Sequence, residues 1–245
     1  MNLFGLTDIG LVRKNNQDSY AIRVLDEDLA IAVVCDGMGG AQAGNVASAV
    51  AVESFSAALE DVCKDGLPPD ADRKQELLRN ACRTANDHVY QLALTNPEYQ
   101  GMGTTLVAAL ILSHEIYVAN VGDSRCYIWS ENVLSQITSD HSLVQALVDC
   151  GDITPEEARI HPKKNLITRA LGVEQDIRCD IFKVDRRNGD KLLLCSDGLT
   201  NVVTDETIKS ELELHTSPED TARILLSHAV EQGAPDNVTV LLAQL

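Results

Sequence analysis

Residues 29–40 read Leu-Ala-Ile-Ala-Val-Val-Cys-Asp-Gly-Met-Gly-Gly, an apolar run that stops at Asp36-Gly37. An unbroken apolar run of this length predicts a strand that is buried on both faces, followed by a glycine-rich loop. Two more runs end in the same way, because Lys191–Cys195 leads into Ser196-Asp197-Gly198 and Tyr117–Val121 leads into Gly122-Asp123. Three buried strands are therefore each expected to end beside an aspartate.

Two further predicted strands begin beside an acidic residue, since Ser19–Leu25 follows Asp18 and Val238–Leu245 follows Asp236. In antiparallel sheets, strands that end at one rim alternate with strands that begin there. Each aspartate alone is typical of a turn, but five beside apolar strands are expected to converge on one edge. Clustered carboxylates must take up protons or bind cations, and all-oxygen ligands select Mg²⁺ or Mn²⁺.

The rest of the chain predicts one α+β domain over residues 1–245, with two antiparallel sheets packed together and helices outside. Small and apolar residues at helical spacing predict helices over 44–61 and 73–95, and Asn96-Pro97 ends the second. Two more helices are expected before the last strand, the second opened by Ser217-Pro218-Glu219. Further strands are predicted at 104–112, 115–121, 125–129 and 133–137.

Residues 142–170 differ in character and predict a small helical excursion. Thr154-Pro155-Glu156-Glu157 has the spacing of a capping box, which marks the start of a short helix. Beyond this excursion, Asn188-Gly189-Asp190 predicts a hairpin turn between strands at 177–184 and 191–195.

Composition excludes several classes of protein. Lys+Arg 20 against Asp+Glu 37 gives a net charge of −17, which disfavours nucleic acid and the basic groove that a metal-dependent nuclease needs. The 7 cysteines show neither Cys-x-x-Cys spacing nor an arginine six positions later, so we interpret them as reduced thiols that act as small hydrophobes. No signal peptide and no apolar run of membrane-spanning length is found, so we expect a soluble cytoplasmic protein without membrane insertion.

Seven short motifs, in their order and spacing, resemble the metal-dependent protein phosphatases of the protein phosphatase 2C type. The resemblance spans nearly the whole chain and is strongest to the compact bacterial serine/threonine phosphatases. The motifs are Arg13-Lys14-Asn15-Asn16-Gln17-Asp18, Asp36-Gly37-Met38-Gly39-Gly40, Gly101-Met102-Gly103-Thr104-Thr105, Val121-Gly122-Asp123-Ser124-Arg125, Ser139-Asp140-His141-Ser142, Cys195-Ser196-Asp197-Gly198-Leu199 and Asp236-Asn237-Val238-Thr239.

The resemblance implies a four-layer α-β-β-α sandwich that hydrolyses phosphoserine and phosphothreonine monoesters with a metal-activated water. It implies two tightly bound Mn²⁺ or Mg²⁺ ions and allows a weaker third. Asp36 is implied to bridge two ions, with Asp197 and Asp236 completing one catalytic site and Asp18 and the Gly37 carbonyl serving the other. It further implies that Asp123 and Asp197 hold the third ion.

Substrate contacts are also implied by the resemblance. Arg13 corresponds to a phosphate clamp, whose planar fork suits two phosphate oxygens. Residues 142–170 correspond to a flap beside the catalytic rim, where Lys163, Lys164 and Arg169 either contact a phosphopeptide or only offset nearby acids. Phosphorylated proteins, including a serine/threonine kinase, are the implied partners, and we expect a monomer.

Two positions depart from the family pattern. Met38 stands where many eukaryotic relatives carry a histidine that protonates the leaving oxygen, and Ala41 stands where many bacterial relatives carry one. The general acid is therefore unassigned, with a metal-bound water as the candidate. Asn237 is expected to hold Asp236 in place, and His141 to make a structural hydrogen bond, with a role as proton donor as the alternative. The alternative function is a phosphoprotein-binding pseudophosphatase or scaffold with the same fold, although such a protein loses acidic ligands that this chain keeps.

Overall fold

The apolar run at residues 29–35 forms strand β3 (Leu29–Met38), whose side chains alternate between two hydrophobic layers. Ile31 and Val33 pack in one layer with helices α1 (Ala43–Asp65) and α2 (Ala71–Thr95), while Ala32 and Val34 pack against the second sheet. Because both faces are buried, the sequence of this strand is continuously apolar instead of alternating.

The computed structural model describes residues 1–40, 43–214 and 217–245. The other strands are β1 (Asn2–Asp8), β2 (Asp18–Asp26), β4 (Gly103–Thr104), β5 (Leu106–Ile111), β6 (Glu115–Val121), β7 (Arg125–Ser130), β8 (Val133–Gln136), β9 (Asp180–Asp185), β10 (Lys191–Cys195) and β11 (Val238–Gln244). One sheet has the order β1-β11-β10-β7-β8 and the other β2-β3-β5-β6-β9, with β4 paired to β3.

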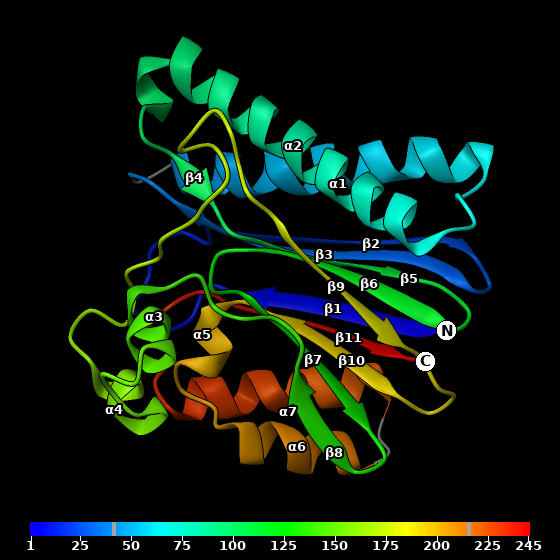
Figure 1. The fold of residues 1–245 in the computed structure, drawn as a ribbon. Coiled ribbons are helices and arrows are strands. Elements are labelled where there is room, and N and C mark those ends of the chain that lie inside the picture. Colours follow the sequence, from blue (N-terminus) through cyan, green and yellow to red (C-terminus); the bar gives the residue numbers. More distant parts are fainter. Residues whose placement is uncertain (41–42, 215–216) are drawn as a thin grey trace.

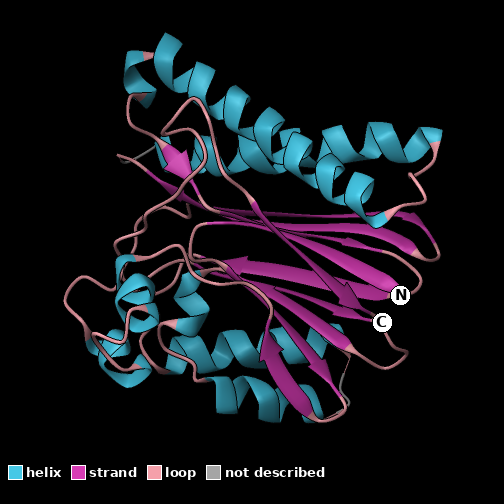
Figure 2. Ribbon diagram, viewed as in Figure 1, coloured by secondary structure: helices cyan, strands magenta, loops and turns pink. Residues whose placement is uncertain are grey.

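Helices cover the outer face of each sheet. The remaining helices are α3 (Leu143–Asp149), α4 (Pro155–Ile160), α5 (Asp197–Thr200), α6 (Asp205–Glu213), α7 (Pro218–Glu231) and the 3₁₀ turn η1 (Pro97–Tyr99). Helices α1 and α2 lie on the β3 sheet and α6 and α7 on the other, which confirms the predicted four-layer sandwich (Figures 1 and 2). None of the described helices is long and apolar enough to cross a bilayer.

The flap contains the short helices α3 and α4, neither of which has a buried residue. The predicted capping box is present, because Thr154 accepts from the Glu157 amide and the Glu157 carboxylate accepts from the Thr154 amide. Ser217 likewise caps α7 as predicted, while the one-turn helix α5 was not predicted.

The predicted hairpin between residues 177–184 and 191–195 is wrong. Strand β9 pairs with β6, whereas β10 pairs with β7 and β11 in the other sheet. All five residues of β10 are buried, so this strand needs a neighbour on each side, while β9 is half exposed and forms an edge. The turn at residues 186–190 thus carries the chain from one sheet to the other.

The strand ends that carry aspartates meet at one rim. Asp18 at the start of β2 pairs directly with Asp36 near the end of β3, and Cys195 at the end of β10 pairs with Val240 near the start of β11. The flap lies at this same end of the molecule, whereas both chain termini lie at the opposite end (Figure 1).

Asn86 on α2 holds the segment that follows the flap. Its side-chain amide donates to the carbonyls of Glu174 and Gln175, and its carbonyl oxygen accepts from the Gly172 amide. Asn86→Ala should lower the free energy of unfolding by about 2–4 kcal/mol, because buried polar groups lose their partners. Chemical denaturation measures the loss, with Asn80→Ala at an exposed position of the same helix as control. Equal losses in the two variants would refute this role.

Candidate metal centre

Five aspartates meet at the rim between the two sheets. Asp18 and Asp36 face each other across β2 and β3, Asp197 begins α5, Asp236 precedes β11, and Asp123 lies in the turn between β6 and β7. Burial raises the pKa of Asp36 well above its usual range, and the charges of the other four carboxylates raise it further. The structure therefore brings together all five aspartates that the strand pattern selected.

Asp18 is only 7% exposed and is held by hydroxyl groups. Its Oδ2 accepts hydrogen bonds of 2.7 Å from both Ser196 and Thr239, while its Oδ1 is buried with no hydrogen-bond partner among the described residues. Burial raises its pKa to about 6, against the opposing effect of the two hydroxyl donors. Neither Ser196 nor Thr239 was identified from the sequence as supporting this carboxylate.

Asp197 is held through one carboxylate oxygen and Asp236 through both. Asn201 donates to Oδ2 of Asp197 at 2.8 Å, and the buried Oδ1 of Asp197 has no partner in the described part of the chain. Arg13 donates to Oδ2 of Asp236 at 2.6 Å, and the Asn237 amide donates to its Oδ1. The predicted phosphate clamp therefore lies at the rim, with its side chain 51% exposed.

The backbone at Asp36-Gly37 is fixed by close contacts. A Cβ atom at Gly37 would lie 2.0 Å from the carbonyl oxygen of Gly44, so no other residue fits without movement of the backbone. Thr104 donates its hydroxyl to the Asp36 carbonyl, and the Thr105 hydroxyl accepts from the Asp36 amide. The sequence had indicated only strand positions for these threonines, yet both position the central aspartate.

Asn237 ties the loop that carries Arg13 to the rim. Its side-chain amide donates to the carbonyls of Ile9 and Asn15, and its side-chain oxygen accepts from the Gln17 amide. Asn237 is 3% exposed, so its side chain belongs to the scaffold, although it holds this loop and only its backbone amide reaches Asp236.

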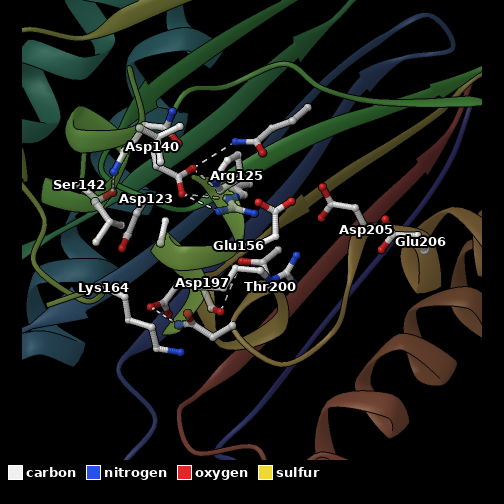
Figure 3. Close-up of a pocket in the computed structure, with 18 residues that line it drawn as sticks. Asp123, Arg125, Asp140, Ser142, Glu156, Lys164, Asp197, Thr200, Asp205 and Glu206 are labelled. Carbon is white, nitrogen blue, oxygen red and sulfur yellow. Dashed lines mark hydrogen bonds and ion pairs between the residues drawn. The ribbon is translucent and has the colours of Figure 1, made fainter. Parts of the chain in front are cut away.

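A pocket of about 420 Å³ opens beside the aspartates (Figure 3). Asp123 and Asp197 line one part of it, and the flap residues Arg159 and Lys164 line another. Arg125 makes a bidentate ion pair with Asp140, at 2.9 and 2.7 Å. Asp123 therefore has no hydrogen bond from Arg125, and it is only 8% exposed.

Arg169 lies outside this pocket. Its guanidinium donates to Asp180 at 3.1 Å and contacts Nε2 of His141, whose Nδ1 accepts from the Gly122 amide. Arg169 instead lines a second pocket of about 270 Å³ together with Met38. Arg159, which lines the first pocket, was not identified from the sequence, because its exposed helical position gave no signal. Ala41 lies outside the described residues.

The comparison with protein families decides the identity of this site. A family model described as protein phosphatase 2C matches residues 12–232, which include all the rim aspartates except Asp236. The chain belongs to the protein phosphatase 2C family.

Relatives in this family match nearly the whole chain. The serine/threonine phosphatase stp of Listeria welshimeri is 40% identical over 238 residues, covering 97% of this chain and 93% of its own length. The crystal structure of serine/threonine phosphatase Stp1 from Staphylococcus aureus superposes with a TM-score of 0.91 at 39% identity, covering 99% of this chain and 94% of that chain. The catalytic domain of PstP in complex with 2 manganese ions has a TM-score of 0.85 at 38% identity, covering 99% and 97%.

The donor atoms of this protein phosphatase 2C member suit hard divalent cations. Among the candidate ligands, the buried oxygens without a hydrogen-bond partner in the described part of the chain belong to Asp18 and Asp197, and every other candidate ligand is also an oxygen. Among the described residues, no three acidic, histidine or cysteine side chains are already arranged as a cation site. Arg13 and the Asn237 amide hold both oxygens of Asp236, so a cation there would compete with these hydrogen bonds, whereas Oδ1 of Asp197 has no hydrogen-bond partner among the described residues.

The raised pKa of Asp18 predicts a pH-dependent stability in the presence of a chelator. The folded carboxyl group keeps its proton up to about pH 6, whereas an unfolded aspartate loses it near pH 4. The free energy of unfolding should therefore fall as the pH rises from about 4 to about 7, by up to about 3 kcal/mol from this group.

Denaturation of wild type and Asp18→Asn at several pH values measures this effect, because subtracting the two curves cancels the titration of every group that Asp18 does not influence. The variant should lack the fall, while Asp26→Asn, at an exposed position at the end of the same strand, should keep it. If the difference in the free energy of unfolding between wild type and Asp18→Asn did not change with pH, the raised pKa of Asp18 would be contradicted.

Proposed function

We propose that this chain is a metal-dependent protein serine/threonine phosphatase that hydrolyses phosphoserine and phosphothreonine monoesters in proteins. The observation that carries the proposal is the set of five aspartates at one rim of a protein phosphatase 2C fold, of which Asp18 and Asp123 are buried. Their oxygens favour Mn²⁺ or Mg²⁺, and residues 1–245 would act as one catalytic domain.

Asp36 is proposed to contact two cations, since it is the carboxylate on which the other four act electrostatically. Asp197 and Asp236 would complete one site, and Asp18 with the Gly37 carbonyl would complete the other. When bound, such cations lower the pKa of a water molecule and polarise phosphoryl oxygens. Thr104 and Thr105 keep the Asp36 backbone fixed while the charges around it change.

Arg13 is proposed to bind the substrate phosphate. Its guanidinium already pairs with a carboxylate at the rim and is half exposed, so a phosphate can reach its remaining donors. If Asp236 turned toward a cation, all the N–H donors of the Arg13 guanidinium would become available to phosphate.

The pocket beside Asp123 is proposed to receive the chain that flanks the phosphorylated residue. Arg159 and Lys164 provide positive charge there, and Asp205 and Glu206 provide negative charge. Lys164 lies on the other side of the pocket from Asp205 and Glu206 (Figure 3). Arg169 remains a proposed substrate contact through the neighbouring pocket that it shares with Met38.

The proposed substrates include a serine/threonine kinase, by analogy with compact bacterial members of the family. The proposed site of action is the cytoplasm, as a monomer. A net charge of −17 supports a protein partner over nucleic acid.

Release of phosphate from a phosphothreonine peptide tests the function directly. Activity should require Mn²⁺ or Mg²⁺, disappear in excess chelator and return when the cation is restored, because the carboxylates alone repel the substrate. A pseudophosphatase would bind the peptide under all these conditions without releasing phosphate. Full turnover in chelator, after removal of bound ions, would eliminate the metal-dependent mechanism.

Asp36→Asn should be the most damaging single substitution. Calorimetry should show Mn²⁺ affinity reduced by more than the roughly 10–100-fold that loss of an outer-shell partner costs, together with loss of turnover. Asp26→Asn, in the same sheet but exposed, controls for the charge change. Unchanged affinity in Asp36→Asn would mean that this residue only shapes the turn.

Asp123→Asn should separate leaving-group assistance from the core reaction. Its carboxylate is proposed to help hold a weaker cation next to the leaving oxygen, where Met38 supplies no proton. The loss of kcat should be larger for phosphoserine than for an aryl phosphate, because a phenolate leaves with little help. Glu156→Gln, on the flap side of the same pocket, should affect both substrates equally. Equal losses in Asp123→Asn would refute the role.

A further inference from the structure

Two cysteines meet between α2 and β9, far from the rim aspartates in sequence. Cys82 on α2 is fully buried, and Cys179 directly precedes β9. Their Sγ atoms lie 2.8 Å apart although the residues are 97 positions apart in the chain. We call Cys82 and Cys179 the thiol pair.

The backbone on both sides of the thiol pair is already fixed. Asn86 lies one turn beyond Cys82 on the same face of α2 and holds residues 172–175 by three hydrogen bonds. Cys179 itself packs against the hydrophobic layer between α2 and the sheet. A bond between the two sulfurs therefore requires little movement of either segment.

One cysteine of the pair is accessible from a pocket lined by three arginines, of which Arg79 and Arg83 pair with Glu76. Cys179 lines a surface pocket of about 560 Å³ with Arg79, Arg83 and Arg178. Asp180 is the only acidic residue that lines this pocket, in a chain whose net charge is −17. Cys179 is thus reachable from solvent, whereas Cys82 is buried.

The Cys82 sulfur is suited to react after that of Cys179. Burial raises the pKa of the Cys82 thiol well above its usual range, and contact with Cys179 raises it further. Cys82 therefore keeps its proton and is shielded from reagents in solvent, while remaining in contact with the sulfur of Cys179.

We propose that Cys82 and Cys179 are a reversible redox site that small peroxides oxidise to a disulfide. The Cys179 thiolate attacks a peroxide oxygen, the O–O bond breaks, and the products are Cys179 sulfenic acid and, after protonation, water or an alcohol. The Cys82 sulfur then attacks the sulfenic sulfur, its proton leaves with the hydroxyl group as water, and an S–S bond forms. The peroxide gains the two electrons that the sulfurs lose, and a thiol reductant reverses the change.

The disulfide would act on the base of the flap. Asp180, next to Cys179, accepts from His141 and Arg169, which lie at the start and end of the flap. His141 in turn accepts from the amide of Gly122, beside Asp123. Joining Cys179 to α2 therefore fixes the residue on which both ends of the flap are held. This proposal extends the proposed phosphatase function but does not depend on it.

Peptide mass spectrometry on the full, Mn²⁺-loaded chain tests the proposal. After reduction and removal of the reductant, hydrogen peroxide should join the two cysteine peptides with the loss of two hydrogens, and a thiol reductant should separate them. The midpoint of thermal unfolding should rise by about 5–10 °C on oxidation, because the bond closes a long loop. Peptides that stay separate while the exposed Cys150 oxidises would overturn the proposal.

Three variants fix the order of events. Cys179→Ser should leave Cys82 reduced and abolish the rise in midpoint, whereas Cys82→Ser should let a dicarbonyl reagent trap sulfenic acid on Cys179. Cys150→Ser should behave like the wild type. Trapping on Cys82 in the Cys179→Ser variant would overturn the assigned order. If the disulfide formed as predicted but no sample had phosphatase activity, the proposed phosphatase function would be contradicted and the redox site would not.

Discussion

The mutual repulsion of buried carboxylates is the constraint on which the rim of this protein depends. Burial disfavours the charge on Asp36, and each of its four neighbours disfavours it further. Each unit of raised pKa corresponds to about 1.4 kcal/mol of unfavourable interaction in the ionised state. The folded protein tolerates this cost because Asp36 and Asp197 stand at the ends of β3 and β10, whose apolar residues are almost wholly buried on both faces. The stability of the sandwich thus holds together charges that would otherwise separate, and protons or cations relieve the repulsion.

Close backbone contacts make this arrangement rigid. A Cβ atom at Gly198 would lie 1.9 Å from the carbonyl oxygen of Asn237, as one at Gly37 would lie against Gly44. The loops therefore pack directly on one another, and small side chains with hydroxyl groups fill the space between them. The Thr105 and Ser124 hydroxyls, 2.7 Å apart, link the strand that supports Asp36 to the turn that carries Asp123. The turn of Asp123 is thus connected to Asp36 without any direct contact between the two carboxylates.

The sequence predicts those parts of the structure that arise from local pattern. Strand β6 and helix α2 follow from periodicity and end signals, and the rim aspartates follow from where apolar runs stop. The sheet to which β10 belongs could not be predicted, because a good turn at residues 188–190 is equally compatible with a hairpin and with a change of sheet. The support of Asp18 by Ser196 and Thr239 joins positions more than 170 residues apart. The thiol pair was missed for the same reason, since spacing along the chain carries no information about such contacts.

The flap illustrates how charge can position a segment that has little hydrophobic anchorage. Neither α3 nor α4 contributes a buried residue, so the hydrophobic effect does little to fix their place. The ends of the flap are instead held by polar groups: His141 and Arg169 both bond to Asp180, and the Thr168 amide donates to the His141 carbonyl. Burial of His141 strengthens these contacts, because a low local dielectric increases the energy of each hydrogen bond. The flap therefore has a fixed base and a weakly packed tip, so its tip can adjust to a protein surface while its base keeps the turn of Asp123 in place.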